Sequence, residues 1–268
     1  MKSDCLRGEW AVVTGACSGI GLEFSHRLAE LGASVVMVSN RERELQEAAR
    51  DVASRHDVNT LPLTLDLTSE KAAEEIMSFI DRNGVDPSVF INNAGIFSFA
   101  PVTETPRGKI DCFIGLHVTA VTSLSREFAL RFAKRGGGRI LNMSSMSCWT
   151  PMPGLAMYAA TKAYIRVFSR ALHYEMRESG VTVTVACPGG IATDLFGLPE
   201  NLKRLAVRIG ALQTPERFTR NAVRKLLKGK MQYINGGLNR MSIVFVGMTP
   251  TWVRMMVKHR LLDRGIRR

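Results

Sequence analysis

The sequence predicts an α/β fold in three layers, with a doubly wound parallel sheet between two layers of helices. Over the first 190 residues, short apolar runs alternate with longer amphipathic stretches. Several of the apolar runs are continuous, as expected for strands that helices cover on both sides. No internal repeat or linker interrupts the 268 residues, which suffice for one large core.

Six strands are expected, in order along the chain. They are Trp10–Thr14, Ser34–Ser39, Thr60–Leu65, Val89–Asn92, Gly138–Asn142 and Val181–Cys187. Between them, apolar residues recur at helical spacing, as from Leu45 to Val52. A further helix is expected from Thr214-Pro215-Glu216 to about Gly229, because proline is favoured in a first helical turn.

The first expected strand leads into a glycine-rich turn, Thr14–Gly21 (TGACSGIG), and a helical pattern follows. A pyrophosphate needs a tight turn, close backbone approach and free N–H groups at a helix N-terminus, which such a turn supplies. The residues expected to bind a dinucleotide here are Gly15, Ser18, Gly19, Ile20 and Gly21. The alternative interpretation is an ordinary glycine turn between a strand and a helix.

The end of the second expected strand predicts which dinucleotide is bound. An acid there would bind the adenosine 2′-hydroxyl and select NAD(H). This strand ends in Val38–Arg41, with no acid before Glu42. Asn40 and Arg41, together with Ser18, suit a 2′-phosphate, so NADP(H) is favoured over NAD(H). The alternative is that Asn40 caps the next helix and Arg41 is solvated.

Tyr158 and Lys162 are four residues apart in an expected helix, so they lie on one face of it. A tyrosine with a pKa of about 10 is a poor base at neutral pH. A nearby ammonium favours the phenolate and lowers that pKa. By itself the pair is equally typical of a half-buried tyrosine beside a surface lysine, so its neighbours decide its meaning.

Other polar motifs follow neighbouring strands. They are Asn92–Gly95 (NNAG), Ser144-Ser145, and Pro188–Thr193 (PGGIAT), and Ser145 lies thirteen residues before Tyr158. Ligands of open α/β sheets bind beyond the carboxyl ends of the strands. We therefore expect these motifs to converge with Tyr158 and Lys162 at one edge of the sheet.

TGxxxGxG, NNAG, the serine, YxxxK and PGxxxT occur in the order and at the spacing of single-domain short-chain dehydrogenases/reductases. The chain resembles this family over about residues 8–195. The resemblance implies a Rossmann-like fold and transfer of a hydride between nicotinamide and a carbonyl or alcohol carbon.

The resemblance also implies roles for individual residues. Tyr158 is the general acid in reduction and the base in oxidation, and Ser145, in preference to Ser144, holds the substrate oxygen near the phenol. Lys162 binds the nicotinamide ribose and lowers the tyrosine pKa. The other expected cofactor contacts are Asp66, Leu67, Asn93, Ala94, Gly95, Pro188, Gly189, Ile191 and Thr193.

His117 departs from the family pattern. The family usually has a catalytic asparagine 25 residues after the first asparagine of NNAG, where this chain has His117. In the family this residue helps to hold a water of the proton relay, largely through its backbone carbonyl, which a histidine also has. The imidazole either fills the asparagine's space, which we favour, or adds a proton path of its own.

Basic charge is concentrated at the C-terminal end. The net charge is +12, but residues 1–200 hold 20 Lys/Arg and 22 Asp/Glu, whereas residues 201–268 hold 16 and 2. We therefore expect a dinucleotide-binding and catalytic Rossmann domain over residues 1–200. Residues 201–268 are expected to form a basic, helical C-terminal lid and extension of the same domain, with the lid over Asp194–Arg208.

The segment Met241–Val257 is apolar, and its charge-free part of 13 residues is too short to span a bilayer as a helix. Three interpretations compete. The segment packs on its own domain or in a homo-oligomer, which we favour; it lies on an anionic membrane surface; or its basic surface receives an acidic substrate carrier.

The cysteines Cys5, Cys17, Cys112, Cys148 and Cys187 show no metal-like spacing. We expect reduced thiols and no metal site. Cys17 and Cys187 fall within motifs and are expected to fill small spaces in the core, with oxidisable thiols as the alternative. Because no apolar signal segment begins the chain, a cytoplasmic protein is expected, with contact to a membrane surface left open.

Together these patterns predict an NADP(H)-dependent oxidoreductase that interconverts a carbonyl and a secondary alcohol on a hydrophobic substrate, such as a lipid, acyl or sterol-like ketone. A homodimer or homotetramer is expected, and nucleic-acid binding is not, because no recognition motif occurs. One alternative is a non-catalytic NADP-binding scaffold, which His117 motivates. Another is an epimerase or dehydratase on the same fold, which the short C-terminal region disfavours.

Overall fold

In the computed structural model, residues 5–191, 212–237, 239–241, 243 and 249–262 are described. Seven parallel strands form one sheet in the order β3-β2-β1-β4-β5-β6-β7. The strands are β1 (Trp10–Thr14), β2 (Ser34–Ser39), β3 (Thr60–Thr64), β4 (Pro87–Asn92), β5 (Gly138–Met143), β6 (Val181–Ala186) and β7 (Gln232–Tyr233). Strand order reverses beside β1, so the predicted doubly wound, Rossmann-like sheet is confirmed.

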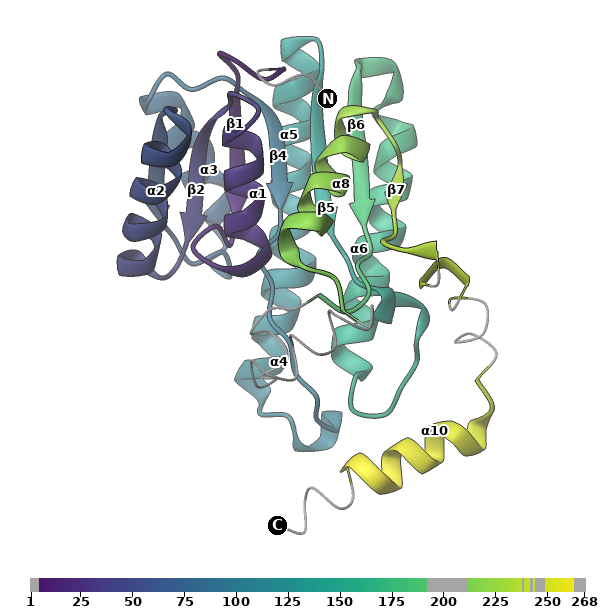
Figure 1. Ribbon diagram of the computed structural model, residues 1–268. Helices are drawn as coiled ribbons and strands as arrows, with labels where there is room; N and C mark the ends of the chain where they lie inside the picture. The colour runs from purple at the N-terminus through teal and green to yellow at the C-terminus, as the bar shows by residue number, and fades with distance from the viewer. Residues whose placement is uncertain (1–4, 192–211, 238, 242, 244–248, 263–268) are drawn as a thin grey trace.

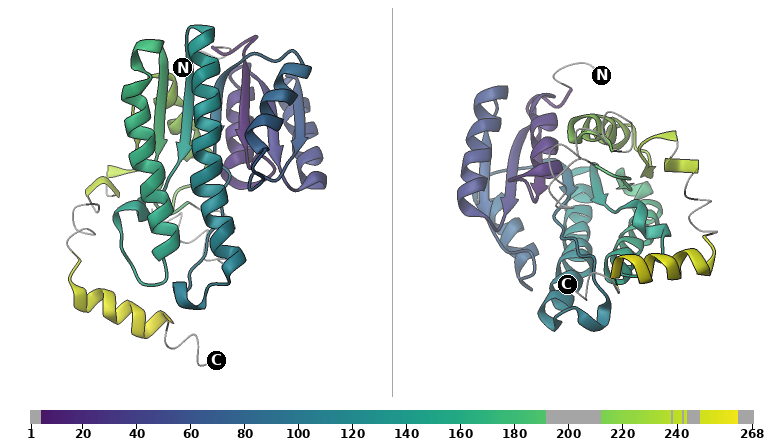
Figure 2. Two further views of the ribbon diagram at one scale, coloured as in Figure 1. Left: turned by 180° about the vertical axis from the view of Figure 1, so that it is seen from behind. Right: turned by 60° about the horizontal axis from the view of Figure 1, so that its bottom comes forward.

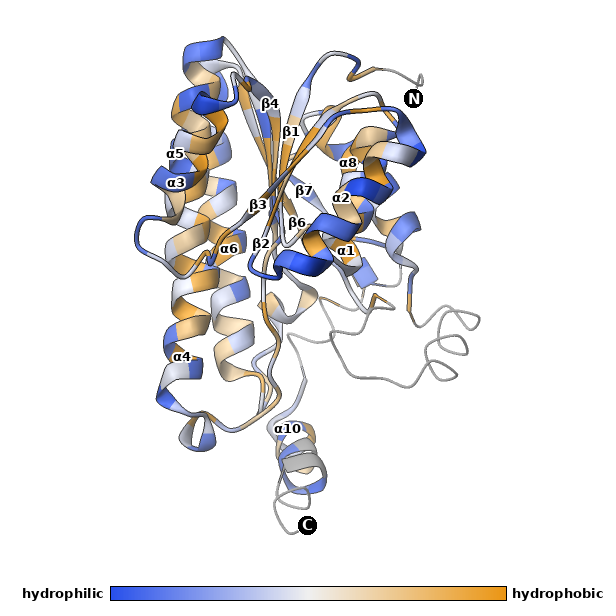
Figure 3. Cartoon of the chain, turned by 90° about the vertical axis from the view of Figure 1, so that its left-hand side faces the viewer, coloured by the Kyte–Doolittle hydropathy of each residue, from blue (hydrophilic) through white to orange (hydrophobic). Residues whose placement is uncertain are grey.

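Helices cover both faces of the sheet (Figure 1). The helices on one face are α1 (Gly19–Ala29), α2 (Glu42–His56) and α8 (Pro215–Leu227), and those on the other are α3 (Ala72–Arg82), α5 (Ala120–Arg135) and α6 (Ala156–Glu175). A helix α4 (Arg107–Ile114) continues into α5 through a five-residue π-helix, Gly115–Thr119. Because α4 extends past the end of the sheet, it stands beside the edge where the strands end (Figure 3).

Two apolar layers hold the helices to the sheet, and the strands between them are apolar on both faces (Figure 3). On one face Phe24 of α1 meets Phe218 of α8 edge-on, with ring centroids 6.2 Å apart. On the other, Phe90 of β4 stacks on Phe128 of α5 at 3.9 Å. Each fully buried side chain of this size contributes about 1.5–3 kcal/mol, so these layers fix the strand ends rigidly.

Helix starts test two sequence predictions. The prediction for α8 is confirmed, since Thr214 caps it and accepts a hydrogen bond from the Arg217 N–H at 3.4 Å. The interpretation of Asn40 as a cap is wrong, because α2 begins at Glu42 with Arg41 in the N-cap position. Asn40 is thus left exposed at the end of β2, outside the helix.

The C-terminal residues divide into two parts. The first part contains α8, which covers one face of the sheet, and β7, which is the last strand of the sheet. The domain boundary expected at residue 200 stays a prediction. The second forms α10 (Thr251–Val257) and a π-helical turn, Lys258–Leu262, which stand away from the three-layer body (Figure 2). Trp252 of α10 is 68% exposed, so this helix does not pack its tryptophan on its own domain.

None of the helices in the described ranges combines the length and the hydropathy needed to cross a bilayer. The predicted lid, Asp194–Arg208, lies outside the described residues, and so does Thr193.

Candidate active site

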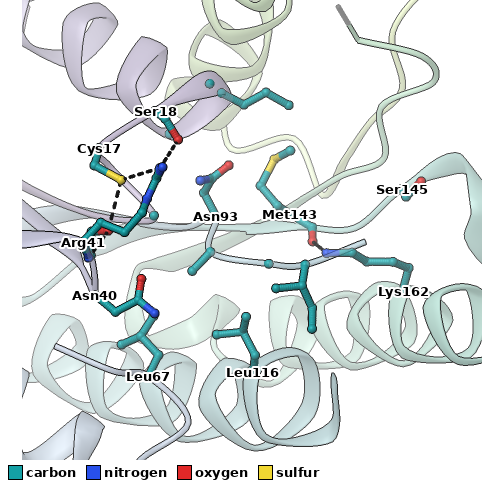
Figure 4. A pocket seen from close by; sticks show the side chains of 18 of the residues that line it. Cys17, Ser18, Asn40, Arg41, Leu67, Asn93, Leu116, Met143, Ser145 and Lys162 are labelled. Carbon is teal, nitrogen blue, oxygen red and sulfur yellow. Dashed lines mark hydrogen bonds between the residues drawn. The ribbon is translucent and has the colours of Figure 1, made fainter. Parts of the chain in front are cut away.

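A cavity of about 500 Å³ opens at the carboxyl ends of the strands (Figure 4). Its volume suits a small-molecule site. The predicted site residues that line it are Gly15, Ser18, Gly19, Ile20, Gly21, Asn40, Arg41, Asp66, Leu67, Asn93, Ala94, Gly95, Ser145, Tyr158, Lys162, Pro188, Gly189 and Ile191. The parallel sheet therefore brings together residues that are up to 176 positions apart in the chain.

The glycine-rich turn lies between β1 and α1, where backbone atoms approach too closely for side chains. A Cβ on Gly21 would lie 2.0 Å from the carbonyl oxygen of Gly15, and Gly15 itself has a φ of +64°. The helical ladder of α1 begins when Leu22 N–H donates to Ser18 O at 3.2 Å. The amides of Gly19, Ile20 and Gly21 precede that bond and border the cavity, so they suit a phosphate at a helix N-terminus.

The NNAG motif is fastened to β1 by Thr14. The Thr14 hydroxyl accepts hydrogen bonds from Asn93 N–H (2.9 Å) and Ala94 N–H (3.1 Å). The side-chain amide of Asn93 donates to the Thr14 carbonyl oxygen at 3.0 Å. These bonds join β1 to the end of β4 at the point where strand order reverses, and so set the width of the crevice there.

Arg41 marks one end of the cavity (Figure 4). Its Nη2 donates to Cys17 Sγ at 2.8 Å and to Ser18 Oγ, and Nη1 lies 3.6 Å from the Glu44 carboxylate. The backbone N–H of Arg41 donates to Ser39 Oγ at 3.2 Å. The guanidinium therefore lies over the glycine-rich turn and is held by two of its side chains, while the arginine side chain stays 48% exposed.

Lys162 lies at the opposite end (Figure 4). Its side chain is 4% exposed, and Nζ donates to the Met143 carbonyl oxygen at 3.0 Å. Burial lowers the Lys162 pKa to about 8. The lysine is thus a buried cation that a backbone dipole of β5 holds, and not the surface lysine of the alternative interpretation.

Tyr158 is 7% exposed and meets the edge of Phe97 at a centroid distance of 5.0 Å. Burial raises the pKa of Tyr158, and a hydrogen bond with Ser145 opposes this in part. The sequence led us to expect a lowered pKa from Lys162, but its Nζ lies 5.7 Å from the ring centroid and is directed to Met143. The phenol is therefore protonated at neutral pH, ready to donate.

The two neighbouring serines are separated by their contacts. Ser144 is buried, and its hydroxyl donates to the Lys162 carbonyl oxygen at 2.6 Å. Ser145 is only half-buried and borders the cavity, where its Oγ accepts from Ser147 N–H at 3.2 Å and interacts with Tyr158. Ser145 is therefore the serine whose proton is available to a substrate oxygen.

His117 lies behind the cavity wall, fully buried in the π-helix. Its Nε2 accepts from the Ile96 N–H at 3.1 Å, so Nδ1 carries the proton and donates to Thr161 Oγ1 at 3.0 Å. Thr161 Oγ1 donates in turn to the Tyr158 carbonyl oxygen at 3.1 Å. Burial, assisted by Lys162, lowers the His117 pKa to about 2. Both ring nitrogens are occupied and the ring is neutral, which favours the space-filling interpretation over a proton path.

Several wall residues were missed by the sequence predictions. They are Cys17, Ser39, Leu65, Thr68, Ile96, Cys112, Leu116, Met143 and Ser144. Most are sequence neighbours of the motifs, so adjacency was an available signal. Leu116 directly precedes His117, whereas Cys112 has no such neighbour and reaches the cavity from α4. Together with Ile96 and Met143 they add apolar surface to the cavity wall.

The comparisons with known proteins agree with one another. A family profile described as short chain dehydrogenase matches residues 9–200. The very-long-chain 3-oxoacyl-CoA reductase of Bos taurus is 33% identical over 192 residues, which are 70% of this chain and 61% of that protein. The match thus spans less than two thirds of the bovine enzyme.

Two further relatives match over more of their length. The inactive hydroxysteroid dehydrogenase-like protein 1 of Homo sapiens is 29% identical over 266 residues, 97% of this chain and 78% of that protein. Among solved structures, a short-chain dehydrogenase from Sphingobium yanoikuyae in complex with NADPH superposes with a TM-score of 0.77 at 25% identity, over 88% of this chain and 92% of that one. The profile match covers β1 to β6 and the whole of α6.

Proposed function

Because this chain belongs to the short-chain dehydrogenase family, we propose that it is an NADPH-dependent reductase that converts a carbonyl on an apolar substrate into a secondary alcohol. Family membership makes it an oxidoreductase with a nucleotide-binding Rossmann fold. The observation that carries the proposal is the convergence of Ser145, Tyr158 and Lys162 on a cavity whose far end holds Arg41.

The cavity residues fit a nicotinamide dinucleotide phosphate. The amides at the start of α1 receive the pyrophosphate, and Arg41 with Ser18 receives the 2′-phosphate. No acid follows β2 before Glu42 to bind a 2′-hydroxyl. The NADPH complex of the Sphingobium relative supports the same choice. When bound, NADPH supplies the hydride that the carbonyl carbon accepts.

The side chains at the other end handle the proton. The Tyr158 phenol donates its Oη proton to the carbonyl oxygen, to which the Ser145 hydroxyl also donates a hydrogen bond. The buried Lys162 ammonium binds the nicotinamide ribose. A raised Tyr158 pKa keeps the donor loaded at neutral pH, which favours the direction from ketone to alcohol.

An apolar substrate is proposed from the walls. Ile96, Leu116 and Met143 line the cavity, and Phe97 packs on Tyr158. Phe99 of the same loop is 40% exposed. Lipid, acyl or sterol-like ketones match these walls, and the bovine relative is a reductase of very-long-chain 3-oxoacyl-CoA.

Assembly and surface contact are part of the proposal. Val167 and Tyr174 of α6 are 63% and 60% exposed, a suitable face for a second copy of the chain. In α10, Trp252 is exposed a few residues before Lys258 and Arg260, a composition that suits contact with an anionic membrane surface. Flotation with anionic and neutral vesicles separates a membrane contact from a contact between copies.

A second candidate is a scaffold that binds NADPH without turnover. The human relative named inactive and the change to His117 favour it. The intact set of Ser145, Tyr158 and Lys162 opposes it, and so does the neutral, saturated state of the His117 ring.

One experiment tests both candidates. Binding of NADPH and NADH to the purified full chain is measured by fluorescence, and oxidation of NADPH is then followed with a panel of apolar ketones. The proposal expects NADPH-selective binding and ketone-dependent oxidation that Tyr158→Phe abolishes. Turnover with NADH alone, or oxidation that survives in Tyr158→Phe, contradicts it; selective binding without turnover on any ketone supports the scaffold.

A further inference from the structure

Two cysteines that the proposed reaction does not use meet beside the active site. Cys148 lies three residues after Ser145 in η3, a one-turn 3-10 helix (Met146–Trp149), and Cys187 directly follows β6. Cys187 is fully buried, and the half-buried Cys148 packs against the apolar cluster that contains it. Both thiols are free, and each shifts the pKa of the other.

The backbone holds the two cysteines in this position. Ser144 N–H donates to Ala186 O at 2.8 Å, and Met146 N–H donates to Pro188 O at 2.8 Å. These two bonds fasten the segment after β5 to the segment after β6, on either side of Cys187. The proximity of the two cysteines is therefore a feature of the folded core, and it does not depend on two surface loops.

The surroundings make the two thiols chemically unequal. The hydrogen bond from Cys187 lowers the pKa of Cys148, aided by the Ser144 hydroxyl and the Arg166 guanidinium. That guanidinium lies 4.4 Å over the Trp149 ring, next to Cys148 in the sequence. The pKa of Cys187 is raised by the same thiol contact and by burial. Cys148 is also the more exposed of the two thiols, so it is the one that reacts first.

We propose that Cys148 and Cys187 are a redox-active pair that hydrogen peroxide converts into a reversible disulfide, and that this bond switches the neighbouring active site off. The Cys148 thiolate attacks one peroxide oxygen, an S–O bond forms as the O–O bond breaks, and the departing hydroxide takes up a proton to become water. The Cys187 sulfur then attacks the sulfenic acid sulfur, and the S–S bond forms as the hydroxyl group leaves with the thiol proton as a second water. Two thiols are oxidised by two electrons, and one peroxide is reduced to two waters.

The bond has a geometric consequence for Ser145. Disulfide sulfurs are about 2.05 Å apart, closer than two thiols in contact, so η3 must shift toward the end of β6. Ser145 caps η3 and accepts from Ser147 N–H, so it shifts with the helix. Since a misplacement of about 1 Å can cost about 100-fold in rate, we expect turnover to fall at least about tenfold in the disulfide form.

The test treats the full-length protein with hydrogen peroxide and follows it by intact mass and peptide mapping, in parallel with NADPH oxidation. The expected result is a loss of two hydrogen masses, a linked pair of peptides that contain Cys148 and Cys187, and a fall in turnover that dithiothreitol reverses. Cys148→Ser and, as a second variant, Cys148→Ala should form no link and keep their turnover in peroxide. Cys5→Ser, at an exposed cysteine far from the cavity, is the matched control and should behave like the unchanged chain.

A map in which Cys148 and Cys187 stay unlinked under peroxide overturns the proposal, and so does a link that leaves turnover unchanged. The switching of activity rests on the proposed reductase function, whereas the peptide map does not. A linked pair in a protein that reduces no ketone would therefore place the failure in the proposed function and not in the disulfide.

Discussion

Backbone groups shape one end of the cavity, and side chains shape the other. At the nucleotide end, the shape comes from the backbone: a turn with no room for a Cβ at Gly21, and amides at the start of α1. At the reacting end, the shape comes from side chains, such as Lys162 on the Met143 carbonyl and His117 between Ile96 and Thr161. Backbone groups do not titrate, so the difference predicts that pH acts mainly on the reacting end.

The largest effect is expected from Tyr158→Phe, which tests whether the two ends act separately. Loss of the proton donor should lower kcat by about 1,000-fold, within the range of general acid catalysis. The affinity for NADPH should stay within a few-fold, since the ring and its contact with Phe97 remain. Steady-state kinetics and fluorescence titration measure the two quantities. A variant that loses both together would show that the two ends are not separable.

Arg41→Ala removes the charged side chain that we propose binds the 2′-phosphate. Removing a charge-assisted hydrogen bond costs about 1.5–3 kcal/mol, so the affinity for NADPH should fall about 10- to 150-fold while that for NADH changes little. Arg43→Ala is a matched control, because Arg43 lies on the same helix, is 89% exposed in its side chain and pairs only with Glu47 in the described structure. Equal losses for NADPH and NADH would contradict a 2′-phosphate contact.

The pH profile should follow Lys162. Its pKa is lowered to about 8, so its charged form is present below that pH and is lost as the pH rises through it. The Tyr158 pKa is raised, so the phenol does not titrate in this range. We expect kcat/KM for ketone reduction to fall above about pH 8, approaching about tenfold per unit. A profile that stays flat well above the Lys162 pKa would show that its charge is not required.

The smallest effect on rate is expected from His117→Asn, which alters the reacting end without touching the cavity. Turnover should stay within a few-fold, because the backbone carbonyl remains and the imidazole is neutral. Stability should fall by about 1–3 kcal/mol, because the Ile96 N–H or the Thr161 hydroxyl loses its partner. Urea unfolding and steady-state kinetics separate the two effects. Complete loss of turnover in a folded variant would show that the imidazole is required.

Most of the fold and cavity could be predicted because the relevant motifs end parallel strands. Gly15, Asn93, Ser145 and Pro188 each follow a different strand, and the sheet alone brings them to one edge. Sequence spacing does not report burial, which is why the direction of the Tyr158 pKa shift was missed. The four-residue spacing placed Lys162 on the same helical face as Tyr158, but it could not show that the Lys162 ammonium is directed to the Met143 carbonyl.

Contacts between distant segments were also beyond prediction. Asn40 looked like a helix cap, but the Ser39 hydroxyl binds the Arg41 N–H and α2 begins one residue later than that interpretation requires. Cys187 was expected to fill a small space in the core, which its burial bears out. Its contact with Cys148 depends on how the segments after β5 and β6 pack, and no local pattern encodes that.

The hydroxyl of Thr14 has a consequence for ligand entry. It accepts hydrogen bonds from the backbone N–H groups of Asn93 and Ala94. These bonds join the two halves of the sheet at the point where strand order reverses. Such a bridge is formed once, during folding, and is already in place when a nucleotide arrives. The crevice is therefore a preorganised slot: association orders the ligand and a few side chains and leaves the sheet itself unchanged, which lowers the conformational entropy lost on binding.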